Sequence, residues 1–185
     1  MNSSPGRFIR SPPNAGRRGS FPSAAEPDWS REACDRFGWC PSRRLIRALR
    51  AYERAQQRGG IAGLALSKVA VLRHRFWTAV TGADIPLGSR IDGGFLLPHP
   101  NGVVVHPDAR LGPNCLLFQQ VTIGTGAKPG VPILGGHVEV GPGAKILGGV
   151  TIGDHVLIGA NAVVVSDVPD RSVAVGVPAV VRPRQ

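Results

Sequence analysis

His99 is the residue whose surroundings in the sequence best suit acid-base chemistry. It lies between two prolines in the run Pro98-His-Pro-Asn-Gly102, which has the composition of a turn. Asp84 precedes it by fifteen residues. A neutral imidazole held by a carboxylate can take a proton from an attacking hydroxyl, because the carboxylate fixes the tautomer and stabilises the imidazolium that forms. His99 and Asp84 are therefore a candidate base and its partner, although a histidine in a turn is more often only a surface residue.

These residues must be positioned by a repeat that fills the second half of the chain. An isoleucine, leucine or valine returns at every sixth position in two phased runs: Val105, Leu111, Leu117 and Ile123, then Val140, Ile146, Ile152, Ile158 and Val164. A short fixed period of this kind predicts a parallel β-helix, in which three repeats close a triangular coil around a continuous core. A β-sandwich would instead show alternation of period two with hairpin turns.

The repeat is interrupted in two places. The anchors before His99 belong to an earlier phase, so two extra residues enter at its turn. The gap between the two later runs is seventeen residues instead of eighteen and contains the glycine- and proline-rich loop 125–132. Interruptions of a solenoid form loops that often carry the functional site. Since one coil takes about eighteen residues, Asp84 and His99 should lie near one corner on adjacent coils.

Composition divides the chain into four parts. Residues 1–29 are rich in Pro, Gly, Ser and Arg and are predicted to be a disordered tail. Residues 30–80 are predicted to be helical, with helices over 42–57 and 61–80 that cap the open end of the coil. The second helix is apolar round much of its circumference, which predicts that it is buried. Residues 81–180 form the β-helix, and residues 181–185 are a short tail.

The net charge of +10 lies entirely before the repeats, mostly as a stripe of arginines on the first helix: Arg43, Arg44, Arg47, Arg50, Arg54 and Arg58. No nucleic-acid-binding motif accompanies the stripe, so a solvated face or a subunit contact is expected instead. Three cysteines, Cys34, Cys40 and Cys115, lack metal or redox spacing and are interpreted as structural or incidental. Without an apolar run of transmembrane length or a signal segment, a soluble cytoplasmic protein is expected.

Six stretches carry a family resemblance: 76–86, 96–105, 118–124, 143–148, 158–165 and 175–179. Together they resemble serine O-acetyltransferase of the hexapeptide-repeat acyltransferase superfamily, over roughly residues 40 to 180. The resemblance implies an all-β fold, a left-handed parallel β-helix with a short helical N-terminal region, assembled as homotrimers. It also implies an enzyme of cysteine biosynthesis, and no metal is expected.

By the same resemblance, His99 takes the place of the catalytic base and Asp84 that of its carboxylate. The implied reaction is direct transfer of the acetyl group of acetyl-CoA to the hydroxyl of L-serine. Coenzyme A would lie in a groove between neighbouring subunits and contact small residues; candidates are Gly141, Gly143, Ala144, Gly159 and Ala160, with Lys145 for a phosphate group. Each of these glycines could equally serve only to form a turn.

The sequence departs from the family in the residues that engage serine. The longer enzymes carry an adjacent His and Arg in the loop that corresponds to 125–132, and a Glu soon after the catalytic His; neither has a counterpart here. His106, Asp108 and Lys128 are the substitutes that we consider. The long helical domain of those enzymes is shortened, which leaves higher assembly and partnership with a sulfhydrylase open.

Other functions stay open at this stage. The acceptor could be a sugar or another small hydroxyl or amine compound. From a different class, the chain could be a non-catalytic β-helix scaffold or a binding module that uses the basic helix.

Overall fold

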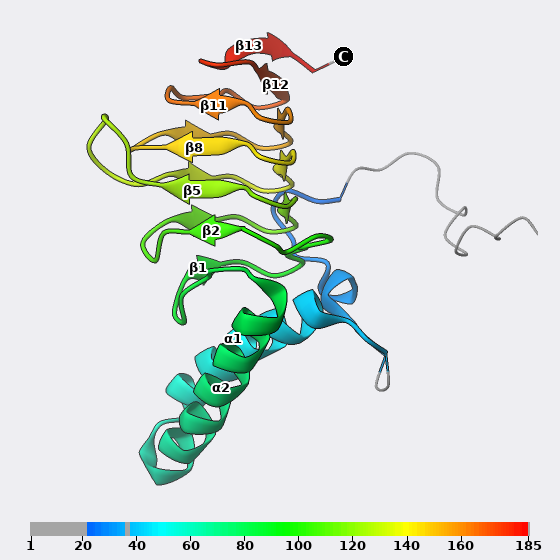
Figure 1. Ribbon diagram of the computed structural model, residues 1–185, viewed down its shortest axis with the longest axis vertical. Helices are drawn as coiled ribbons and strands as arrows, with labels where there is room; N and C mark the ends of the chain where they lie inside the picture. The colour runs from blue at the N-terminus through cyan, green and yellow to red at the C-terminus, as the bar shows by residue number, and fades with distance from the viewer. Residues whose placement is uncertain (1–21, 36–37, 185) are drawn as a thin grey trace, which may run out of the picture.

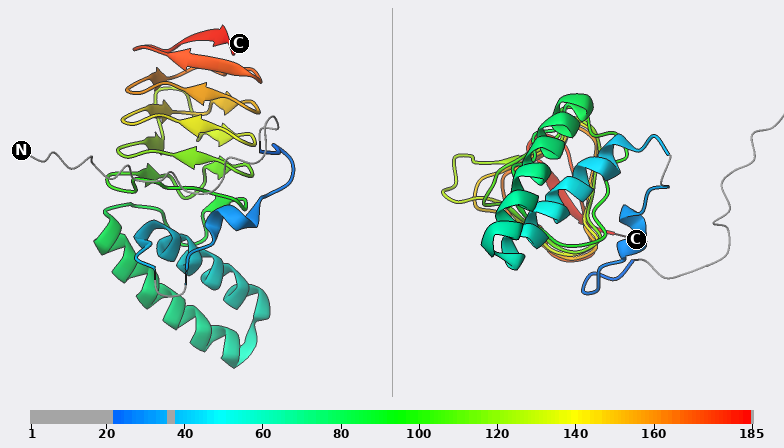
Figure 2. Two further views of the ribbon diagram at one scale, coloured as in Figure 1. Left: turned by 90° about the vertical axis from the view of Figure 1, so that its right-hand side faces the viewer. Right: turned by 90° about the horizontal axis from the view of Figure 1, so that it is seen from below.

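The computed structural model describes residues 22–35 and 38–184. Short strands are stacked into a tall triangular prism, and two long helices extend from its lower end (Figures 1 and 2). In the view from below, successive coils superpose on one triangle (Figure 2). The predicted parallel β-helix, preceded by a helical region, is confirmed. Residues 1–21, most of the predicted disordered tail, lie outside the described residues.

A short 3₁₀ helix, η1 (Trp29–Glu32), is followed by the antiparallel helices α1 (Pro41–Arg58) and α2 (Gly60–Thr81). Each long helix begins and ends within one residue of its predicted bounds. Gly59 and Gly60 both have positive φ, 62° and 63°, which lets the chain reverse between the helices. The amphipathic α1 turns its apolar side toward the same core that the lowest coil encloses.

Three sheets form the faces of the prism. Face A contains β2 (Val104–Val105), β5 (Thr122–Gly124), β8 (Lys145–Leu147) and β11 (Val163–Val164). Face B contains β1 (Arg90–Ile91), β3 (Arg110–Leu111), β6 (Ile133–Leu134) and β9 (Thr151–Ile152). Face C contains β4 (Leu116–Leu117), β7 (Glu139–Val140), β10 (Leu157–Ile158), β12 (Ser172–Val175) and β13 (Val180–Pro183).

The six-residue period sets the register of all three faces. On face A, Val105 pairs with Ile123, Ile123 with Ile146, and Ile146 with Val164, so one inward anchor stands above the next. These anchors are at most 2% exposed. The positions four residues after an anchor also face the core, as Cys115 and Ala144 show with no exposed surface. Burial raises the pKa of the Cys115 thiol to about 12.

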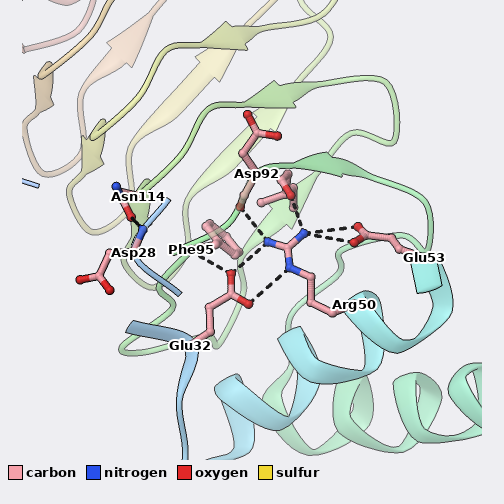
Figure 3. A network of polar contacts seen from close by, with 8 residues as sticks. Asp28, Glu32, Arg50, Glu53, Asp92, Phe95 and Asn114 are labelled. Atoms are coloured by element: carbon pink, nitrogen blue, oxygen red, sulfur yellow. Dashed lines mark hydrogen bonds and ion pairs between the residues drawn. The ribbon is translucent and has the colours of Figure 1, made fainter. Parts of the chain in front are cut away.

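Arg50 of α1 ties the helices to the lowest coil (Figure 3). Its guanidinium lies 3.0 Å from Glu32 Oε1 of η1 and 3.3 Å from Glu53 Oε1, and it donates hydrogen bonds to the carbonyl oxygens of Ile91 and Asp92. Its side chain is only 11% exposed. The expected solvated or intersubunit arginine stripe is therefore wrong for Arg50. It joins three segments that are distant in the sequence.

Two other arginines of the stripe also have partners inside the chain. Arg43 donates to the carbonyl oxygen of Ala33, and Arg44 donates to that of Gly38 at 3.2 Å. The guanidinium of Arg44 also lies 5.5 Å from the centre of the Trp77 ring, a cation–π distance. Half of the stripe thus serves the fold of the helical region, which weakens its interpretation as a binding surface.

Residues 22–29 correct the predicted disordered tail. They run along the edge between faces B and C, where Asn114 lies with no exposed surface. The Asn114 side chain accepts a hydrogen bond from the Asp28 N–H and donates to the carbonyl oxygens of Ser23 and Glu26, each at 2.8 Å. A buried amide needs such partners. The segment supplies them from its backbone, which composition does not reveal.

The predicted burial of α2 is wrong for most of its apolar side chains. Only Gly63, Ala70, Trp77 and Thr81 are buried. The following large apolar residues are between 41% and 90% exposed: Ile61, Leu64, Leu66, Val69, Leu72, Phe76 and Val80. In one copy of the chain α2 has α1 on one side only, so its remaining apolar surface stays uncovered (Figure 2).

The two ends of the described chain contain two further departures from expectation. Cys34 and Cys40 form a disulfide, a pairing that their spacing did not predict. The predicted tail 181–185 begins as a strand, because β13 pairs antiparallel with β12 at the top of face C. Arg184 then reaches back and donates to the carbonyl oxygen of His155.

Candidate active site

Asp84 and His99 lie at the lower end of face A, where the chain leaves α2. Asp84 forms a parallel bridge with Val104: its N–H donates to Val103 O at 2.7 Å and its carbonyl accepts from the Val105 N–H at 2.9 Å. His99 lies in the turn that leads into β2. Both residues are exposed. The coil therefore holds the backbone of Asp84 firmly while leaving its carboxylate at the surface.

One backbone hydrogen bond links the two segments that carry these side chains. The Gly102 N–H, three residues after His99, donates to Gly82 O, two residues before Asp84, at 2.8 Å. The sequence prediction that both residues lie near one corner on adjacent coils agrees with this pairing. Within residues 22–35 and 38–184 no hydrogen bond or ion pair joins the two side chains, so their action as a dyad stays a prediction. The His99 ring lies 6.4 Å from that of Phe118.

His99 marks the lower end of a continuous edge between faces C and A. We call residues 98–102, 118–120, 141–143 and 159–161 the His99 edge. Backbone hydrogen bonds connect its turns: Gln120 N–H to Asn101 O, Gly143 N–H to Gln119 O, and Asn161 N–H to Pro142 O, at 2.8 to 2.9 Å. A ligand lying along this edge would therefore extend from His99 across several coils.

Four of the six candidate CoA residues lie on the His99 edge: Gly141, Gly143, Gly159 and Ala160. A Cβ at Gly143, whose φ is 73°, would lie 2.1 Å from Asn161 Oδ1, so this glycine is required by the stacking of the turns themselves. The turn alone therefore explains the glycine at position 143, and binding of CoA by this residue stays a prediction. Ala160 is exposed, and its N–H has no partner among the described residues.

The other two candidates are placed differently. Ala144 faces the core with no exposed surface, its N–H donates to Gly141 O, and its carbonyl accepts from the Thr122 N–H. Within one copy of the described chain it presents neither an exposed side chain nor an unpaired backbone group, and its contact with CoA stays a prediction. Lys145 lies on face A beside the edge, where its Nζ donates to Gln120 O at 2.5 Å. A phosphate contact from Lys145 would replace that hydrogen bond.

The three substitute acceptor residues lie on another edge, between faces A and B. We call residues 106–109, 125–132, 148–150 and 165–167 the loop edge. There the His106 Nδ1 accepts from the Asp108 N–H at 3.2 Å, and Lys128 Nζ lies 3.2 Å from Asp167 Oδ1. A hydrogen bond from the Thr151 N–H, followed by Lys128, lowers the pKa of Asp167. Within one copy of the chain these residues are not brought to His99.

The described residues contain no group of three or more His, Cys, Asp or Glu side chains that could hold a metal ion. Among the helices of the described segments, none is both long and apolar enough to cross a bilayer.

Comparison with known proteins identifies the type of coil. Residues 132–166 match the family described as bacterial transferase hexapeptide (six repeats). Serine acetyltransferase of Helicobacter pylori is 45% identical over 100 residues, which cover 52% of this chain and 58% of that protein. The Staphylococcus aureus enzyme is 36% identical over 131 residues, covering 69% and 58%.

Solved structures of serine acetyltransferases are also similar to this chain. Serine acetyltransferase from Brucella abortus superposes with a TM-score of 0.66 at 27% identity, covering 78% of this chain and 57% of that one. The Neisseria gonorrhoeae enzyme in complex with serine gives 0.64 at 33% identity, covering 78% and 57%. The chain resembles serine acetyltransferases in both sequence and fold. This confirms the family resemblance and the left-handed β-helix with a helical N-terminal region. The chain spans about half the length of the curated relatives that it matches.

Sequence reasoning passed over Gln119, which lies on the His99 edge. Its side-chain Oε1 is buried and has no hydrogen-bond partner among the described residues. Its neighbour Phe118 is the residue whose ring faces His99. The sequence contains a signal for Gln119, because residues 118–120 form the turn that corresponds to 141–143 and 159–161 in the next two coils.

Proposed function

We propose that this chain is an acetyl-CoA-dependent acetyltransferase that converts L-serine to O-acetylserine for cysteine biosynthesis in the cytoplasm. The observation that carries the proposal is the exposed pair Asp84 and His99 at the lower end of the His99 edge, in a chain similar to serine acetyltransferases. The exposed Ala160 with its unpaired N–H provides an accessible position for CoA further along that edge. Acetyl-CoA is the second substrate.

In the proposed reaction His99 removes the proton of the serine hydroxyl, and Asp84 stabilises the imidazolium. The oxygen attacks the thioester carbon, and a C–O bond forms. When the tetrahedral intermediate collapses, the C–S bond breaks and the CoA thiolate leaves. The proton on His99 passes to the sulfur, which restores the base. Holding the two substrates together supplies much of the acceleration.

A homotrimer would complete the site. The His99 edge and the loop edge flank face A, whose outward residues include the exposed Val104. If three copies pack these faces around a threefold axis, the loop edge of one copy lies beside the His99 edge of the next. Lys128, His106 and Asp108 would then approach the base of the neighbouring subunit, which they do not do within one chain.

The test is release of free thiol from acetyl-CoA with a panel of acceptors: L-serine, homoserine, sugars and small amines. We expect turnover with L-serine, and none when its hydroxyl is absent, as in L-alanine. Turnover with a sugar or an amine but not with serine would assign the transfer to another acceptor. No thiol release with any acceptor would leave a non-catalytic scaffold as the better description.

A further inference from the structure

Face B carries a pair of arginines that the proposed reaction does not use. Arg90 of β1 and Arg110 of β3 are in-register neighbours, and both are exposed. Neighbouring strands are about 4.8 Å apart, so the two side chains leave the sheet close together. Like charges directly opposite one another destabilise a sheet. An anion bound between the two guanidinium groups would relieve this repulsion.

Neither guanidinium is neutralised by the rest of the described chain. The side chains of Arg90 and Arg110 form no hydrogen bond, ion pair or aromatic contact with residues 22–35 or 38–184. Two acids stand near the pair: Asp108 lines the same hollow as both arginines, and Asp92 follows Arg90 by two residues. The Asp108 side chain is 73% exposed and lies 3.9 Å from His106 Nδ1, and among the described residues neither acid forms an ion pair with Arg90 or Arg110. Both guanidinium groups therefore remain without an ion-pair partner among the described residues.

The arginines line a hollow of about 560 Å³, which we call the arginine hollow. Gly130 and Val131, at the end of loop 125–132, form part of its wall. Next to Arg110 on face B comes Ile133, 44% exposed, and then Thr151. The volume falls in the range of about 300 to 1,000 Å³ that small-molecule sites occupy.

We propose that the arginine hollow binds a small organic molecule through its phosphate group. The phosphate oxygens would lie between Arg90 and Arg110, since planar guanidinium groups bind phosphate with two parallel hydrogen bonds. The carbon portion would cover Ile133, next to the exposed Thr151. This site is separate from the His99 edge, so its occupancy does not depend on acetyl transfer.

The first test is thermal unfolding of the full chain in phosphate and in chloride at equal pH and ionic strength. Phosphate should raise the Tm of the wild type, because a ligand that binds only the folded state stabilises it. The rise should disappear in Arg90→Gln/Arg110→Gln. Arg47→Gln, which removes an exposed arginine of α1, is the matched control and should keep it. An equal phosphate effect in the double variant would overturn the proposal.

Arg110→Glu separates loss of binding from loss of folding. The new carboxylate would face Arg90 across the strands, so the Tm without phosphate should stay the same or rise. Titration with glycerol 3-phosphate should show binding at least about tenfold weaker than in the wild type, because one charge-assisted contact is lost and a repulsion is gained. Unchanged affinity in this folded variant would contradict the site.

Parallel titrations with CoA and dephospho-CoA identify the source of the phosphate. If Arg110→Glu weakens binding of CoA but not of dephospho-CoA, the hollow holds the 3′-phosphate of the cosubstrate. If only glycerol 3-phosphate is affected, it holds a separate metabolite. If the wild type binds none of these ligands, the proposal is wrong, whether or not the chain transfers acetyl groups.

Discussion

Arg50→Ala should be among the most destabilising single substitutions in the helical region. The arginine side chain is 11% exposed, and that of its partner Glu32 is 9% exposed. Burial alone would lower the pKa of Arg50, yet the hydrogen bond and charge of Glu32 outweigh it, and the pKa is raised. Arg50 and Glu32 therefore stabilise each other through their hydrogen bond and opposite charges at a site from which water is largely excluded.

The expected loss in the free energy of unfolding depends on the buried groups that lose their partner in Arg50→Ala. Without Arg50, Glu32 would keep only the hydrogen bond from the Phe95 N–H at 3.2 Å, and the carbonyl oxygens of Ile91 and Asp92 would lose a donor. Removing one member of a buried ion pair costs about 3 to 5 kcal/mol. At about 2 to 4 °C per kcal/mol for a chain of this size, the Tm should fall by roughly 6 to 20 °C.

The assay is chemical and thermal unfolding at one protein concentration, with Arg47→Ala as control. The control removes an exposed arginine from the same helix and should change the free energy of unfolding by less than about 0.5 kcal/mol. The double variant Arg50→Met/Glu32→Leu should be less destabilised than Arg50→Ala, because no buried charge is left alone. Equal stability of Arg50→Ala and Arg47→Ala would refute this reasoning.

Three other predictions concern the candidate site, the N-terminal segment and the buried His137. His99→Ala should lower kcat for acetyl transfer by about a hundredfold or more without changing the Tm, and Asp84→Asn should lower it less; a fully active His99→Ala would exclude the base. Asn114→Gly can keep the positive φ of 62° but removes the side-chain amide that bonds to the backbone of Ser23, Glu26 and Asp28. Limited proteolysis should therefore cleave residues 22–32 faster than in the wild type. Equal cleavage rates would contradict the role given to the Asn114 amide. Burial lowers the pKa of His137, so as the pH falls the unfolded state takes up the proton before the folded state does, and the free energy of unfolding should decrease below about pH 6.5. In urea titrations His137→Asn should make the free energy of unfolding less dependent on pH in this range. An unchanged pH dependence would assign it to other groups.

The coil could be predicted from the sequence because its determinants are local and repeated. Every anchor is buried by its counterpart in the next coil, so a period of six is enough to place Ile123 above Val105. The turn of His99 could be found for the same reason, as an exception to the period. Ala144 follows from the same period, because it lies four residues after Val140 and faces the core.

The remaining features depend on contacts between distant segments. Nothing in the composition of residues 22–29 distinguishes a disordered tail from a backbone that satisfies Asn114, since any residue supplies a carbonyl oxygen. Arg50 has the same spacing as the other arginines of its stripe, and only the positions of Glu32 and the lowest coil make it different. The separation of the His99 edge from the loop edge is likewise a property of the closed triangle.

The antiparallel strand β13 determines how the stack ends. All other strand pairs of the prism run parallel, so a free top coil would offer the edge on which a further coil, or the first coil of another molecule, could continue the same hydrogen-bond pattern. By folding back on β12 in the opposite direction, residues 180–183 occupy that edge on face C and break the pattern. The helices cover the other end. On face C the parallel stack of coils therefore ends at β12, because the antiparallel β13 does not repeat the hydrogen-bond pattern that another coil would need.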